Sequence, residues 1–228
     1  MSAAPDLERL ARDYAAAGDW PGVAQTREQQ AKAALQKGDL GQAASQLREA
    51  LSLFVMVDDG YNAGRALADL AEVRLAQGDY LAAAELSGQA ADRIPGDVQA
   101  LTTLGYAEWQ AGSPADAEGT FSQALHWDAD APRALAGRGQ VRAELGNFAD
   151  ALDDLDRVLA DDLPADALPP ALRADALSAR ALALAGLGRT AEARDELARA
   201  LAFDPDRKRT VAQADRIAAL AARPSATR

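Results

Sequence analysis

The sequence has no cysteine, a single histidine and only 5% aromatic residues. Without cysteine the chain can form neither disulfides nor cysteine zinc sites, and thiolate catalysis is excluded. One histidine, His126, cannot supply the several convergent groups that a catalytic or metal site needs. Neither a Gly-Lys-Ser/Thr phosphate loop nor a Gly-x-Ser-x-Gly motif occurs. We therefore predict a non-enzymatic protein with no cofactor and no metal.

Long apolar runs are also missing, and no stretch approaches the 18 or so residues of a membrane span. The start of the chain, residues 1–6, has neither a basic region nor the apolar core of an export signal. These features predict a cytoplasmic protein with no membrane insertion.

Acidic residues outnumber basic ones by 35 to 24, which gives a formal net charge of −11. Such a charge repels phosphate backbones, so we expect no nucleic-acid partner, and the basic residues within 206–228 are too dispersed to change this. Asp153 and Asp156 are placed one turn apart and could offer a carboxylate pair to a divalent cation. They belong to an acidic cluster with Asp154, Asp161 and Asp162, and the favoured interpretation of this cluster is a solvated helix face.

Alanine is abundant, which favours helices over strands, and the helical segments repeat. A glycine that ends one helical run recurs, and small residues follow it at fixed offsets of five and twelve positions. The glycines are Gly38, Gly78, Gly112, Gly146 and Gly188, and the residues five positions later are Ala43, Ala83, Ala117, Ala151 and Ala193. Such a register through five copies predicts a stack of similar helix pairs.

The third copy is the clearest, with Leu104-Gly105 in its first helix, and with Ala117 and Phe121 in its second helix. This pattern resembles the tetratricopeptide repeat (TPR), in which Leu-Gly and Ala-x-x-x-Phe recur with a period of 34 residues. Pro95 and Pro205 match the closing proline of the family in two other copies, whereas Leu101 replaces the usual tryptophan. The resemblance implies an all-α, right-handed superhelical solenoid of antiparallel helix pairs.

The physical role of each column is clear without the family. Small residues allow two antiparallel helices to approach closely. The glycine supplies the left-handed residue that ends the first helix. Four residues that directly follow these glycines are suitable N-caps for the second helix, and they are Asp39, Asp79, Ser113 and Asn147.

We expect a capping helix in residues 1–20, about five helix pairs over 21–205, a second capping helix in 206–222 and a disordered tail at 223–228. Irregular gaps between the glycines place insertions near 54–61 and 161–170. The second insertion contains Pro164, Pro169 and Pro170, which a continuous helix interior does not accommodate.

In the TPR family the first helices line a concave groove, and this resemblance implies which residues would face a partner. The expected groove residues are Lys32, Arg65, Glu72, Gln99, Thr102, Tyr106, Trp109, Arg133 and Gln140. Further positions on the first helix of the first copy are Glu28 and Leu35. Tyr106 and Trp109 would form an aromatic patch with a polar rim, which is typical of a binding hot spot. Packing of Trp109 in the core is the alternative for this residue.

Two functions follow as hypotheses. The first is a protein-protein interaction scaffold that binds a peptide or partner protein in the groove. The alternative is a regulatory or sensor protein whose solenoid changes curvature on binding a small ligand or signalling peptide, with the insertion near 164–170 as the hinge. The oligomeric state is left open.

Arg74, Glu108 and Arg142 are 34 residues apart, and we expect them to form a ladder of ion pairs between copies.

Overall fold

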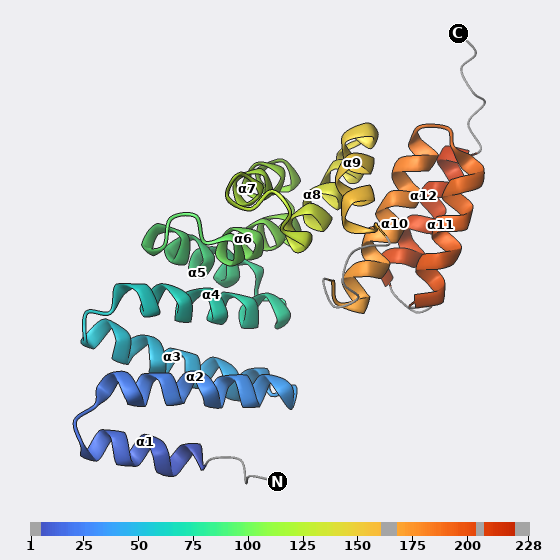
Figure 1. The fold of residues 1–228 in the computed structure, drawn as a ribbon. Helices are drawn as coiled ribbons and strands as arrows, with labels where there is room; N and C mark the ends of the chain where they lie inside the picture. Colours follow the sequence, from blue (N-terminus) through green and yellow to red (C-terminus); the bar gives the residue numbers. More distant parts are fainter. Residues whose placement is uncertain (1–5, 161–167, 204–207, 222–228) are drawn as a thin grey trace. The chain divides into compact units, whose positions relative to one another are not determined.

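The computed structural model describes residues 6–160, 168–203 and 208–221, and these residues form helices joined by turns, with no strand among them (Figure 1). The chain divides into two compact units, residues 1–111 and residues 112–228, which we name unit 1 and unit 2. Each unit is all-α, as the alanine content predicts.

In unit 1 each helix packs against the next one along the chain, and α4 also packs against α6. In the described part of unit 1 the helices are α1 (Leu7–Ala16), α2 (Trp20–Gln36), α3 (Leu40–Met56), α4 (Gly60–Ala76), α5 (Tyr80–Arg93) and α6 (Val98–Gln110). Figure 1 shows α1 to α4 stacked in sequence order. Ala31 and Ala34 of α2 share a buried cluster with Leu70 and Val73 of α4, so the first helices of successive repeats are neighbours.

Unit 2 repeats this arrangement, because α8 packs against α7, α9 and α10, and α10 packs against α9 and α11. Its described helices are α7 (Pro114–Trp127), α8 (Pro132–Leu145), α9 (Phe148–Val158), α10 (Pro170–Gly186), α11 (Thr190–Phe203) and α12 (Lys208–Ala221). The last helix packs on α10 and α11. There Ile217 is buried, and the Ser178 hydroxyl is hydrogen-bonded to Oε1 of Gln213. Residues 223–228, where we expect a disordered tail, lie outside the described residues.

The repeat glycines have the backbone conformation that the sequence predicts. Their φ angles lie between +75° and +95°, and the residues are Gly38, Gly78, Gly112, Gly146 and Gly188. This left-handed region is costly for residues with a Cβ atom, so glycine is needed where the chain reverses.

The small-residue columns form the helix crossings. The alanine five positions after each repeat glycine has no exposed surface, and these residues are Ala43, Ala83, Ala117, Ala151 and Ala193. The residues seven positions after these alanines are equally buried, and they are Ala50, Ala90, Ala124, Val158 and Ala200. Both columns are confirmed as packing positions.

The four predicted residues all occupy the N-cap positions of their helices, and two of them form the capping hydrogen bond with their side chains. The side chain of Asp39 accepts a hydrogen bond from the backbone N–H of Gln42, and that of Asp79 accepts one from Ala82. Ser113 and Asn147 are also at the N-cap positions of α7 and α9, but their side chains form no capping hydrogen bond. At α7 the following Pro114 already fixes the backbone of the first helical turn.

The first insertion lengthens a helix. The helix α3 has 17 residues, whereas α5 has 14, and the extra length brings Phe54 into the core. Part of the second insertion, residues 161–167 with Pro164, lies outside the described residues. Pro170 begins α10, a position that needs no backbone N–H donor.

Close approach of α7 and α8 depends on Gly137. A Cβ atom at Gly137 would lie 2.4 Å from Cζ of Phe121, a fully buried ring. We therefore expect Gly137→Ala to reduce the free energy of unfolding by about 1–3 kcal/mol, the usual cost of overpacking. Gly119→Ala, on an open position of α7, is the matched control and should increase stability by up to about 1 kcal/mol through helix propensity. Chemical denaturation of both variants measures the difference, and equal effects would contradict the close approach.

Candidate functional site

One pocket of unit 1 is formed mainly by α2 and α4, the first helices of two successive repeats, with Leu40 contributed by α3. It has a volume of about 250 Å³, and we name it the α2–α4 pocket. Its lining residues are Lys32, Leu35, Leu40, Asp69, Glu72, Val73 and Ala76. Lys32, Leu35 and Glu72 are positions that the sequence predicts for the groove. The structure therefore brings together side chains from equivalent helices of two repeats, as the repeat register requires.

A buried carboxylate lies one helical turn before Lys32. Glu28 is only 8% exposed, and its Oε1 has no hydrogen-bond partner among the residues that the structure describes. Burial raises the pKa of Glu28, with opposing effects from the charges of Arg65 and Lys32 and a reinforcing effect from Asp69. This part of the groove face is therefore acidic and only partly compensated.

Asp69 connects the pocket to α6. Nε2 of Gln99 donates a hydrogen bond of 3.1 Å to Oδ1 of Asp69. Burial raises the pKa of Asp69 as well, and the Gln99 hydrogen bond lowers it by less. Arg65 is exposed on the same helix, α4. The predicted residues Lys32, Arg65, Glu72 and Gln99 thus belong to one connected polar surface of unit 1.

The raised pKa of Glu28 gives a pH-dependent prediction. An acid whose pKa is higher in the folded state costs stability above that pKa, because the folded state must hold the charge. Glu28→Gln is therefore expected to stabilise the protein by about 1 kcal/mol at pH 7, since burying an amide costs less than burying a charge. The gain should shrink as the pH falls toward 4.5 and Glu28 becomes protonated.

The measurement is urea denaturation of both proteins between pH 4.5 and 7. Glu85→Gln, at an exposed position of α5, is the control and should change stability little at any pH. A stability gain that does not depend on pH would contradict the burial of a charged Glu28.

Three predicted groove residues of α6 are covered. Thr102 is buried, and Tyr106 and Trp109 are 9% and 6% exposed, with ring centroids 6.2 Å apart. The expected aromatic patch is therefore largely buried. Of the two interpretations of Trp109, packing in the core agrees better with its burial than exposure in the groove does. The remaining predicted residues belong to α8 in unit 2, where Arg133 is half-buried and Gln140 is buried.

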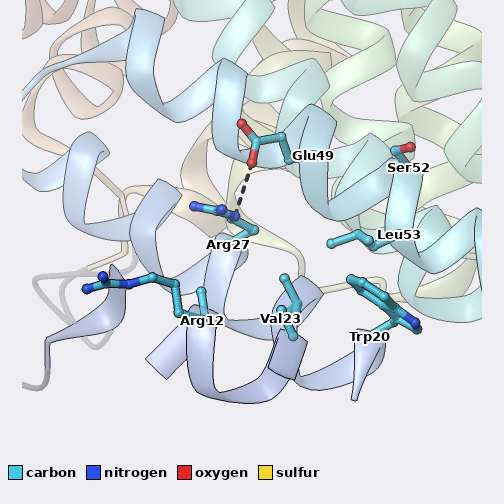
Figure 2. Close-up of a pocket in the computed structure, with 9 residues that line it drawn as sticks. Arg12, Trp20, Val23, Arg27, Glu49, Ser52 and Leu53 are labelled. Atoms are coloured by element: carbon cyan, nitrogen blue, oxygen red, sulfur yellow. Dashed lines mark ion pairs between the residues drawn. The ribbon is translucent and has the colours of Figure 1, made fainter. Parts of the chain in front are cut away.

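A second pocket of unit 1 was not predicted. It has a volume of about 390 Å³ and lies between α1, α2 and α3 (Figure 2). Trp20, Val23 and Leu53 form its apolar side, and the Arg27–Glu49 ion pair of 3.0 Å borders it (Figure 2). Trp20 begins α2 and is 41% exposed. A tryptophan in a chain with only 5% aromatic residues is the signal in the sequence that indicates this site.

Charged residues of unit 2 form a closed network instead of an open site. Asp154 is 2% exposed and accepts two hydrogen bonds from Arg138, at 2.7 and 2.8 Å, and one from Arg142 at 2.9 Å. Nε of Arg142 also donates to Glu118 at 2.8 Å. The solvated-face interpretation of this acidic cluster is thus wrong for Asp154, because α8 covers it with two arginines.

The ladder of Arg74, Glu108 and Arg142 stays a prediction, and the two arginines have other partners within their own units. Arg142 is bound to Glu118 and Asp154, while Nη1 of Arg74 donates to Gln77 in the turn after its own helix at 3.0 Å. Against the opposing effect of burial, the Glu118 hydrogen bond and the charges of Asp154 and Glu118 raise the pKa of Arg142, so its guanidinium remains charged. The network joins α7, α8 and α9 within unit 2, which is a structural role.

The described residues show neither a metal-binding cluster nor a membrane span. Across these residues, no group of three or more histidines or carboxylates is placed to hold a metal ion. None of the described helices combines the length and hydrophobicity needed to cross a bilayer.

Comparison with family models identifies the class of protein. Two tetratricopeptide repeat models match the chain, one over residues 74–141 and the other over residues 28–98 and 143–208. Together with the buried alanine columns and the left-handed glycines, these matches show that the chain belongs to the tetratricopeptide repeat family. No curated protein is similar enough to the chain to count as a match.

Solved structures share the fold. YrrB, described as a TPR protein with an unusual peptide-binding site, is 18% identical, with a TM-score of 0.61 over 93% of this chain and 100% of its own. TTC0263, a thermophilic TPR protein of Thermus thermophilus, is 22% identical, with a TM-score of 0.58 over 86% and 98%. PilF of Pseudomonas aeruginosa is 15% identical, with a TM-score of 0.65 over 92% and 96%. The fold class is thus an all-α TPR solenoid, and membership of this family indicates an interaction scaffold.

Proposed function

We propose that the chain is a non-enzymatic scaffold that binds a peptide or a partner protein on the first helices of unit 1. The observation that carries this proposal is the α2–α4 pocket, in which predicted groove residues of two repeats line one cavity. A repeat stack offers such an elongated surface for recognition of an extended or helical segment.

The exposed residues Lys32, Arg65 and Gln99, together with Glu72 at the pocket, make up the proposed contact surface. The buried Thr102, Tyr106 and Trp109 belong to the packed part of the neighbouring helix α6. Substitutions at those three positions would therefore disturb the fold together with binding, and the test has to use the residues at the surface.

The test compares capture of partners by the immobilised chain and by the Lys32→Ala/Glu72→Ala variant. We expect the variant to retain at least tenfold less of the main partner that quantitative mass spectrometry identifies. Lys37→Ala/Glu85→Ala, which removes the same charges at exposed positions outside the pocket, is the control and should retain it fully. Equal capture by both variants would reject the placement of the binding surface.

A further inference from the structure

The α2–α4 pocket differs from a small-molecule site in size and in lining. Its volume of about 250 Å³ lies below the range of about 300–1,000 Å³ that is typical of ligand pockets. It is large enough for one long side chain of a bound partner. Leu35, Leu40, Val73 and Ala76 make part of its lining apolar, while Asp69 and Glu72 add two carboxylates and Lys32 adds one cation.

We propose that this pocket receives the side chain of a lysine or arginine, and that the segment bound by the scaffold is therefore basic. The inference rests on the proposed function and adds the chemistry of the partner. Lysine and arginine combine a methylene stem with a charged end, so the stem can cover apolar surface while the end reaches a carboxylate. Such a side chain matches both parts of the lining.

The local charge balance favours a cation. Around the pocket the acidic groups that act on one another outnumber the basic ones. The carboxylates of Asp69 and Glu72 and the cation of Lys32 line the pocket, while Glu28 and Arg65 interact with these groups from outside the lining. This surplus of negative charge contrasts with unit 2, where Arg138 and Arg142 balance the carboxylates of Asp154 and Glu118.

Glu28 is the second, independent observation. It lies one turn before Lys32 on α2, and the charged groups that act on it belong to α2 and to the start and middle of α4. Its Oε1 is buried and lacks a hydrogen-bond partner in the part of the chain that the structure describes. A buried carboxylate of this kind is unfavourable in the free protein. Because Glu28 interacts electrostatically with Lys32 and Asp69 of the pocket lining, a cation bound in the pocket reduces this cost.

Two other occupants fit less well. An acidic side chain would add charge of the same sign to a group of carboxylates, and the net charge of −11 would also repel an acidic partner. A divalent cation needs several oxygen ligands at one point, whereas the described residues contain no cluster of three or more carboxylates or histidines that could hold a metal ion. A basic peptide is attracted by the carboxylates and needs no cluster of several oxygen ligands.

The experiment selects random twelve-residue peptides by phage display on the immobilised full chain. We expect the selected peptides to share a lysine or arginine at one aligned position. Synthetic copies of the best peptide then give dissociation constants by fluorescence anisotropy. Replacing the shared basic residue by norleucine, which keeps the stem and removes the charge, should weaken binding at least tenfold.

The protein side of the test uses Asp69→Asn/Glu72→Gln, which should also weaken binding of the basic peptide at least tenfold. Glu85→Gln/Asp92→Asn, at exposed positions of α5, makes the same change in net charge and should leave the affinity within about twofold. The norleucine peptide tests the charge on the unchanged protein, so the result does not depend on how well the variant folds.

The outcomes separate the two proposals. Selected peptides that share an acidic or apolar position, or that bind equally well with norleucine, would overturn the basic partner and leave the scaffold function intact. Failure of the chain to select any peptide would overturn both.

Discussion

Replacing Asp154 with alanine is expected to lower the free energy of unfolding of unit 2 by about 3–5 kcal/mol. Asp154 accepts hydrogen bonds from Nε and Nη2 of Arg138 and from Nη1 of Arg142. Its side chain is only 3% exposed. Its removal leaves two partly buried guanidinium groups without their shared carboxylate. The cost of burying those charges, more than the loss of the hydrogen bonds themselves, makes the effect large.

Urea denaturation gives the total loss, and hydrogen exchange of α8 and α9 amides shows whether the loss is local to unit 2. Asp130→Ala is the control, because its ion pair with Arg157 has the same 2.7 Å length but is exposed. We expect that control to cost less than about 1 kcal/mol. If the two variants lost the same stability, the network around Asp154 would have to be open to water.

The repeat register was predictable from sequence because it depends on residues with few alternatives. A left-handed turn strongly favours glycine, and a close helix crossing requires a small side chain, so both leave a periodic trace. The φ angles of Gly38 to Gly188 and the complete burial of Ala43 to Ala193 confirm that trace.

The charge network of unit 2 was not predicted, because its ion pairs depend on which side chains the packing of α7, α8 and α9 brings together. The position of a residue within one repeat does not give this information. Comparison of equivalent positions would have helped, since Arg138–Asp154 and Arg180–Glu196 are both separated by 16 residues and occupy corresponding places in successive repeats. A ladder that joins the same position in successive repeats does not include such pairs, which join a first helix to the second helix of the same repeat.

The surface that we propose for binding contains only part of the predicted groove residues. Helical periodicity places Lys32, Glu72, Tyr106 and Trp109 on comparable faces of their helices, but it does not say how closely the next helix covers each face. In the structure Lys32 and Glu72 line a pocket, whereas Tyr106 and Trp109 are buried. Exposure therefore separates positions that the repeat pattern treats as equal.

Replacing Phe54 with alanine is expected to lower the free energy of unfolding of unit 1 by about 3–5 kcal/mol. Phe54 has no exposed surface, and its cluster contains Ala24 of α2, Ala50 of α3, and Ala63 and Ala66 of α4. Alanine methyl groups are short and have no other rotamer with which to refill the space. Leu51 and Leu53 of α3 are the larger side chains that pack against this cluster, and they can refill the cavity only in part, so the cost should lie within the usual range for a buried phenylalanine.

Val55→Ala is the matched control, since Val55 is the next residue of α3 and is 56% exposed. We expect it to change stability by less than about 0.5 kcal/mol, as is usual for surface positions. Thermal and urea denaturation compare the two variants under the same conditions.

The same substitution also tests how the core positions the proposed binding surface. Phe54 packs between α2 and α4, and these two helices carry most of the α2–α4 pocket. At a temperature where Phe54→Ala remains folded, we expect weaker binding of a groove-bound peptide, because the two helices are no longer held at one spacing. Unchanged affinity in a clearly destabilised variant would mean that the pocket keeps its shape without this ring, and that the buried alanine columns alone set the distance between the helices.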